Sequence, residues 1–201
     1  AEGPPATPGD ALVCLDLESL GFLGRPLFLI GALFSGGDAA GAVGGRAGAT
    51  RLVQYLARDY SEEEAVVRAF SREAAGVSTW VTFNGRTFDL PLLRLRAAYH
   101  RIRAPLPDRH VDLLPAARRL WGSRLPNCRL QTLERLVCGR RPRRGDIDGG
   151  EIPRAYHDFV RSGEPWEMLR VLEHNAADLL TLLQLLDAAR REGFHGGAEA
   201  D

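Results

Sequence analysis

The sequence contains no lysine, and all 26 of its basic residues are arginine. This absence excludes a Walker-type phosphate loop, which uses a lysine to contact the nucleotide, and it excludes chemistry through a lysine Schiff base. The glycine-rich stretch 36–48 is therefore predicted to be an ordinary loop. Cysteine is also scarce. Because Cys14, Cys128 and Cys138 form neither a C-x-x-C pair nor an even disulfide framework, we expect free thiols.

Long uncharged apolar runs are absent too, so no membrane span is expected. The first nine residues are rich in proline and do not have the pattern of a signal peptide. A length of 201 residues with 45% hydrophobic content suits one soluble domain. We expect a cytoplasmic protein with a disordered tail over residues 1–9, one folded domain over 10–191, and a second disordered tail over 192–201.

The net charge is zero, but it is unevenly distributed. Residues 94–144 hold 14 arginines against three acidic residues, a net charge of +11, whereas residues 1–93 and 145–201 carry −4 and −7. Such a basic band can attract phosphate backbones, to which arginine makes bidentate contacts. A solvated surface in an arginine-rich protein would explain the band equally well.

Hydrophobic periodicity and turn signals predict alternating blocks of strand and helix. Strands are expected over 12–20, 27–34, 51–56, 80–83 and 110–112; helices are expected over 61–75, from about 88, over 113–121, over about 131–137, and from near Pro153 and Pro165. The first three strands suggest an antiparallel meander. The helix that opens with the capping box Ser61 to Glu64 would then cross over, placing the fourth strand parallel to the first. We predict an α/β fold with a mixed five-stranded sheet, three antiparallel strands followed by parallel ones, flanked by helices.

Two acids interrupt the apolar first strand. Side chains alternate along a strand, so Asp16 and Glu18 share one face, and no basic residue within the run can pair with them. Buried charge must be paired, neutralised by a pKa shift or bound to a metal, which makes this D-x-E motif a candidate cation site. An edge strand with a solvated polar face would account for the motif as well.

The predicted last helix, about 167–190, contains another acid in apolar surroundings. Its apolar residues recur at steps of three and four and predict one buried stripe: Leu169, Leu172, Ala176, Leu179, Leu183 and Leu186. Asp178 lies on a different face together with His174, four residues earlier. A simple helical His–Asp pair and a bound metal are both adequate explanations.

The order of these acids, with Asp89 just after the fourth strand, resembles the DEDD (DnaQ-like) exonucleases of the ribonuclease H-like superfamily, and more closely their YprB-type branch. The motifs that carry the resemblance span nearly the whole chain: residues 16–19, 82–93, 110–114, 128–134, 146–147 with 150–153, and 174–178. Their order and spacing together are far more specific than any single one.

The resemblance implies a 3′–5′ exonuclease that hydrolyses phosphodiester bonds at single-stranded ends with two divalent ions, Mg²⁺ or Mn²⁺. It implies that Asp16 bridges the two ions, that Glu18 and Asp178 complete one of them, and that Asp89 holds the other. All four ligands offer oxygen, which these ions prefer. His174 would accept a proton or position the water.

Some residues retain alternative explanations. Better-studied branches usually carry their histidine five residues before the last acid and their tyrosine four residues before it, so His174 stands in the tyrosine register. Asn84, Gly85 and Asn175 are candidate substrate-binding residues, although a tight turn would explain the first two. Asp89 would also serve as the cap of its helix. Three further residues are interpreted as structural: His110, Asp112 and Asp146.

Two other functions are compatible with the sequence. The basic band and the unusual histidine register suit a catalytically weak or inactive nucleic-acid-binding or scaffold module that keeps the fold. A hydrolase that uses paired carboxylates on another substrate, such as a glycosidase, is supported only by the acids.

Overall fold

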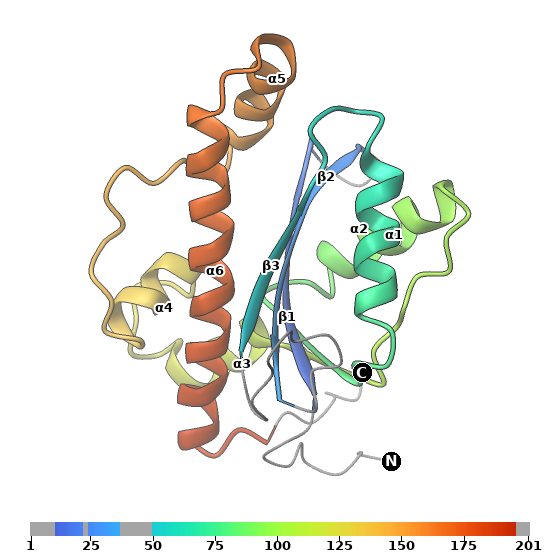
Figure 1. Ribbon diagram of the computed structural model, residues 1–201. Coiled ribbons are helices and arrows are strands. Elements are labelled where there is room, and N and C mark those ends of the chain that lie inside the picture. The colour runs from blue at the N-terminus through green and yellow to red at the C-terminus, as the bar shows by residue number, and fades with distance from the viewer. Residues whose placement is uncertain (1–10, 22–23, 37–49, 196–201) are drawn as a thin grey trace.

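The computed structural model describes residues 11–21, 24–36 and 50–195, which form a five-stranded sheet with helices on both faces (Figure 1). The strands are β1 (Leu12–Ser19), β2 (Leu27–Ser35), β3 (Arg51–Leu56), β4 (Thr79–Thr82) and β5 (Arg109–Asp112). The helices are α1 (Glu63–Glu73), α2 (Asp89–Tyr99), α3 (Leu113–Trp121), α4 (Leu130–Leu136), α5 (Ile152–Ser162) and α6 (Trp166–Arg191). Figure 1 shows α6 along one face of the sheet and α1 and α2 along the other.

The sheet has the order β3-β2-β1-β4-β5. β1 pairs antiparallel with β2, and β2 pairs antiparallel with β3, whereas β1 and β4, and β4 and β5, are parallel. The predicted mixed sheet is therefore confirmed. Because β1 lies at the centre of the sheet, the explanation of Asp16 and Glu18 as residues of an edge strand is wrong.

Alternation along β1 divides the core into two layers. Val13 and Leu15 pack with Phe70 of α1 on one side of the sheet, and Cys14 packs with Leu179 of α6 on the other. Since residues two apart share a face, Asp16 continues the side that carries Cys14 and points toward α6. The centre of the sheet thus presents its acids beneath the last helix.

The buried stripe of α6 differs from the predicted one. Leu169 is 45% exposed, whereas Met168, Val171 and Leu182 are buried. Leu179 and Leu186 of the predicted stripe are buried as expected. The buried side of the helix also includes Asn175, a polar residue that the apolar pattern ignored and that has no exposed surface.

The predicted capping box of α1 is not formed. The N-cap residue is Glu62, with no side-chain capping bond, and the helix begins at Glu63. Ser61 lies one residue before the N-cap, and both its N–H and its hydroxyl donate to the Asp59 carboxylate, at 2.7 and 2.6 Å. The serine therefore belongs to a local turn that precedes the helix.

A buried ion pair joins β2, α1 and α2. The Glu63 carboxylate accepts hydrogen bonds from Arg96 Nε at 2.6 Å and from the Leu27 N–H at 2.7 Å, and His100 Nε2 lies 3.0 Å from it. The Glu63 and Arg96 side chains are only 5% and 9% exposed. One buried carboxylate therefore contacts three elements of the fold.

Part of the predicted C-terminal tail, residues 192–195, is described by the structure. Phe194 donates its N–H to the Ala189 carbonyl at 3.0 Å, and Glu192 accepts a hydrogen bond from Trp121 Nε1 at 2.7 Å, so this part of the predicted C-terminal tail is tied to the fold. Residues 196–201, the predicted tail 1–9 and residues 37–48 of the glycine-rich loop lie outside the described residues. Within the described ranges, no helix combines the length and apolarity that a bilayer span requires, although α6 has 26 residues.

Candidate functional site

The four predicted acids come from three elements that are distant in sequence. Asp16 and Glu18 lie on β1, Asp89 is the first residue of α2, and Asp178 lies on α6. Burial raises the pKa of Asp16 well above its usual range, and the neighbouring carboxyls of Glu18, Asp178 and Asp89 raise it further. The fold thus brings Asp89 of α2 and Asp178 of α6 within electrostatic reach of the two acids of β1.

The other three carboxyls show the same effect. Burial raises the pKa of Glu18 to about 8, helped by Asp178 and Asp89, and burial raises the pKa of Asp89 to about 7. Burial also raises the pKa of Asp178, although His174 and Arg143 oppose the shift. The raised pKa values mean that ionisation of these four carboxyls is unfavourable. A bound cation would reduce the repulsion between their negative charges.

Three of the acids are bonded to groups of the chain itself. Asp16 accepts from the Asn175 amide at 2.8 Å, Asp89 from the Leu17 N–H at 3.1 Å, and Asp178 from Arg143 Nη2 at 2.6 Å. Among the described residues, no three His, Cys, Asp or Glu side chains are gathered in the geometry of a metal site. The four carboxylates suit a divalent cation in charge and in atom type, but they would have to reorient in order to bind one together.

Asp89 does not cap its helix. The N-cap residue of α2 is Phe88, which makes no side-chain capping bond, and Asp89 already belongs to the first turn. Its carboxylate instead reaches across to the backbone of β1 at Leu17. This bond holds the start of α2 beside the acids of β1.

Asn175 of α6 forms hydrogen bonds with Asp16 of β1 and with Gln54 of β3. Its Nδ2 donates to Asp16 Oδ2 and, at 3.2 Å, to the Asp16 carbonyl, while its Oδ1 accepts from Gln54 Nε2 at 2.9 Å. Asn175 is fully buried, so it contacts Asp16 and the sheet rather than an open cavity. The close approach requires glycine opposite, because a Cβ at Gly31 would lie 2.1 Å from Asn175 Oδ1.

Gly31→Ala is expected to lower the free energy of unfolding by about 1–3 kcal/mol, the usual cost of overpacking a buried contact. The added methyl group must displace Asn175 and therefore α6. Urea denaturation followed by circular dichroism would measure the loss. Gly149→Ala is the matched control, since nothing lies within 4 Å of a Cβ there. Equal stability of the two variants would contradict the close contact.

Asn84 and Gly85 form the tight turn between β4 and α2. Asn84 has a φ of 62°, and its N–H donates to Asp112 Oδ1 at 2.7 Å. A Cβ at Gly85 would lie 2.3 Å from Thr82 Oγ1. The turn is therefore sufficient to explain both residues, and substrate binding by them stays a prediction.

The residues interpreted as structural have clear contacts. Asp112 caps α3 by accepting from the Leu114 N–H at 3.1 Å, which confirms its predicted role. His110 Nε2 lies 2.9 Å from Thr82 Oγ1, on the neighbouring strand. Asp146 is more than a structural residue of its loop, because its carboxylate lies 2.8 Å from Nδ1 of His174. His174 belongs to the candidate site.

A cavity of about 440 Å³ adjoins the acids. Its wall combines three of the carboxylates with apolar and glycine residues: Asp16, Leu17, Glu18, Ser19, Gly21, Phe88, Asp89, Leu92, Gly149, Gly150 and Pro153. Phe88 is 48% exposed. The cavity is therefore lined both by carboxylates and by apolar side chains.

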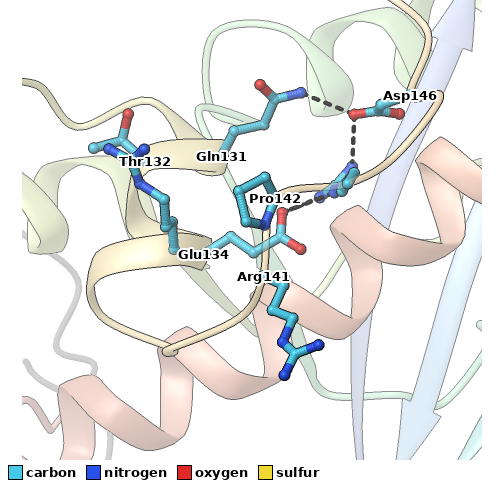
Figure 2. A pocket seen from close by; sticks show the side chains of 8 residues that line it. Gln131, Thr132, Glu134, Arg141, Pro142 and Asp146 are labelled. Atoms are coloured by element: carbon cyan, nitrogen blue, oxygen red, sulfur yellow. Dashed lines mark hydrogen bonds and ion pairs between the residues drawn. The ribbon is translucent and has the colours of Figure 1, made fainter.

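A second cavity of about 290 Å³ is lined by residues of α4 and by residues 141–146 of the loop that follows it (Figure 2). Arg143 lines it and connects two acids, with its Nη2 2.6 Å from Glu134 Oε2 and 2.6 Å from Asp178 Oδ1. From the sequence, Arg143 was predicted only as part of the basic band. Its contacts with Glu134 and Asp178 could not be predicted, because they form only when the loop folds over α6.

Comparisons with known proteins agree with this architecture. The family model of the RNase_H superfamily matches residues 13–190. The chain is 37% identical over 134 residues to "Uncharacterized protein YprB" of Bacillus subtilis (strain 168), an alignment that covers 66% of this chain and 32% of that protein. The chain therefore spans about a third of the length of this relative.

A solved structure has the same fold. The family B DNA polymerase from the hyperthermophilic archaeon Pyrobaculum calidifontis superposes with a TM-score of 0.62 and 15% identity. The match covers 93% of this chain and 25% of the polymerase chain. At this identity the likeness establishes the fold alone.

Proposed function

Since the chain belongs to the RNase H superfamily, we propose that it is a metal-dependent nuclease that removes nucleotides from the 3′ ends of single-stranded nucleic acid. The predicted YprB-type ribonuclease H-like identity is confirmed by the family match and by the 37% identity to YprB. Membership of this superfamily suggests a nuclease. The observation that supports the more specific proposal is the mutual electrostatic interaction of Asp16, Glu18, Asp89 and Asp178 beside a cavity.

In this proposal Asp16, Glu18, Asp89 and Asp178 hold divalent ions, Mg²⁺ or Mn²⁺. Their oxygen-only donor set and their repulsion in the absence of a counter-charge suit hard cations. When bound, such ions lower the pKa of a water molecule and neutralise the charge of the scissile phosphate.

The chain would contribute binding and proton transfer. Phe88 and Leu92 give the terminal base an apolar surface in the cavity, and base stacking on an aromatic ring tolerates any sequence. In the reaction, water adds to phosphorus, the bond to the 3′ oxygen breaks, and that oxygen takes up a proton, which releases a nucleoside 5′-phosphate. His174 would accept the proton that the water loses.

The direct test is degradation of a single-stranded oligonucleotide labelled at its 5′ end. With Mn²⁺ we expect a ladder of products shortened from the 3′ end, and excess EDTA should abolish it because the four carboxylates would lose their counter-ions. A circular single strand of the same sequence is the control and should stay intact. Cleavage of the circle would contradict the requirement for an end, and an intact linear substrate would contradict nuclease activity.

A nucleic-acid-binding module without turnover is the second candidate. It is favoured by the ion pair between Arg143 and Asp178, which engages one of the proposed ligands at 2.6 Å. Retention of the oligonucleotide without shortening, in Mg²⁺ and in Mn²⁺, would support this module over the nuclease.

Both candidates predict that arginines beside the second cavity bind the strand. Arg135 and Arg141 line this cavity and are exposed. Replacing both by glutamine should weaken oligonucleotide binding and reduce the slope of log K against log salt concentration by about 1–2, roughly one per lost phosphate contact. Fluorescence anisotropy at several salt concentrations would measure this slope.

The matched control replaces Arg154 and Arg161 on α5, which are 84% and 80% exposed and pair with Asp158. This double variant removes the same charge and should leave the slope unchanged. If both double variants change the slope equally, the binding responds to overall charge rather than to the cavity beside α4.

A further inference from the structure

Asp146 lies in the loop between α4 and α5 and is held in place from several sides. Its Oδ2 accepts from Gln131 Nε2 at 2.9 Å, as Figure 2 shows, and its Oδ1 accepts from the Ile147 N–H at 3.1 Å. Arg143 Nη1 lies 3.6 Å from Oδ2. The carboxylate therefore has a defined position before its contact with α6 is considered.

The backbone of the same loop is bound to α6. Arg170 Nε donates to the Gly145 carbonyl at 3.0 Å, and Arg170 Nη2 donates to the Asp146 carbonyl at 3.1 Å. Arg170 precedes His174 by four residues and so lies one turn away on the same side of the helix. These bonds fix the distance between the loop and the imidazole.

His174 stands between two carboxylates at unequal distances. Its Nδ1 is 2.8 Å from Asp146 Oδ1, a hydrogen-bond distance, whereas its Nε2 is 3.4 Å from Asp178 Oδ2, beyond the usual range. A carboxylate can only accept a hydrogen bond, so Nδ1 must be the donor to Asp146. In a neutral imidazole, Nε2 is then left as an acceptor on the side of the proposed ligand Asp178.

We propose that Asp146 is a positioning residue that holds His174 in the Nδ1–H tautomer, with Nε2 on the side of the proposed metal ligand Asp178. This inference rests on the proposed function, in which His174 accepts a proton from water. It extends that function by a residue 28 positions away in sequence, which acts only through the histidine. Partners of this kind set both the tautomer and the orientation of a functional imidazole.

The first test does not depend on activity. Protein labelled with ¹⁵N-histidine, in Mg²⁺ at pH 8, should show His174 with its proton on Nδ1 in the wild type and on Nε2 in Asp146→Ala. The five histidines of the chain allow assignment of the signal by its loss in His174→Gln. Asp146→Asn retains a carbonyl acceptor and should keep the wild-type tautomer. Asp148→Asn, on the same loop and exposed, should also keep it.

The second test is kinetic. Asp146→Ala should lower kcat by about 10- to 100-fold with little change in KM, and Asp146→Asn should retain more activity than Asp146→Ala. In the His174→Gln background, Asp146→Ala should have almost no additional effect, because its role passes through the imidazole.

Three results would overturn the proposal: a wild-type His174 protonated on Nε2, an unchanged tautomer in Asp146→Ala, or an equal loss of activity from Asp146→Ala with and without His174. The last result would make Asp146 a structural residue of the loop. If the wild-type protein cleaves no oligonucleotide, the proposed function fails, and the tautomer measurement alone then decides whether Asp146 holds His174.

Discussion

Asp16→Asn is expected to abolish degradation of the labelled oligonucleotide while making the metal-free protein more stable. Asp16 is one of the residues that would hold the divalent cations, and its loss should reduce the rate by roughly 10³-fold or more, since a divalent ion supplies several kcal/mol of charge stabilisation. Stability should rise because burial and three neighbouring carboxyls raise the pKa of Asp16, so its charged form is unfavourable in the folded state. Gel assays and thermal melts in EDTA measure the two effects.

The opposite signs of these two effects distinguish a functional acid from a structural one. Asp187→Asn is the matched control, because Asp187 lies on α6, is 64% exposed and pairs with Arg191. This control should retain both activity and melting temperature. Degradation of the substrate by Asp16→Asn at the wild-type rate would contradict the proposal that these acids form a nuclease site.

Glu63→Gln is expected to lower the free energy of unfolding by about 3–5 kcal/mol, the usual cost of removing one partner from a buried ion pair. Arg96 would keep its charge in a site where it is 9% exposed. For a domain of this size the melting temperature should fall by roughly 6–20 °C, at 2–4 °C per kcal/mol. Glu64→Gln is the control: its pair with Arg68 is about half exposed on both sides, so its effect should stay below ~1 kcal/mol.

The contribution of Glu63 should also depend on pH. Burial by itself raises the pKa of Glu63, but hydrogen bonds from Arg96, from the Leu27 N–H and from His100 lower the pKa below its usual value. A carboxyl with a lowered folded-state pKa stabilises the fold above its unfolded pKa, about 4.3, and this stabilisation is lost as the pH falls through the folded-state value. The difference in unfolding free energy between wild type and Glu63→Gln should therefore be constant near neutral pH and shrink below about pH 4. A constant difference down to pH 2 would contradict this linkage.

The architecture could be predicted because it depends on local patterns. Apolar runs bounded by turn residues identified β1 to β5, and the antiparallel meander followed by a crossover helix implied a mixed sheet. The central position of β1 came only from the structure. The D-x-E motif was visible because two acids in an apolar strand need an explanation wherever the strand lies. The same local patterns failed at Ser61, whose hydroxyl bonds to Asp59 instead of α1.

Contacts between distant segments could not be predicted. Nothing near Asn175 in the sequence indicates that it reaches Asp16 on β1 or that Gly31 must lack a side chain. In the same way, Asp146 gave no signal as the partner of His174, because their separation of 28 residues is bridged only when the loop docks on α6.

The amino-acid sequence by itself therefore determined the order of strands and helices, the family, and the four acids that most need a counter-charge. Tertiary structure alone decided how those acids are held: Asp16 by Asn175, Asp178 by Arg143, and the neighbouring His174 by Asp146. The physical reason is the range of the interactions involved. Periodicity and turn chemistry act over a few residues, whereas hydrogen bonds between buried side chains depend on distances that exist only after the sheet, the loop and α6 have packed together.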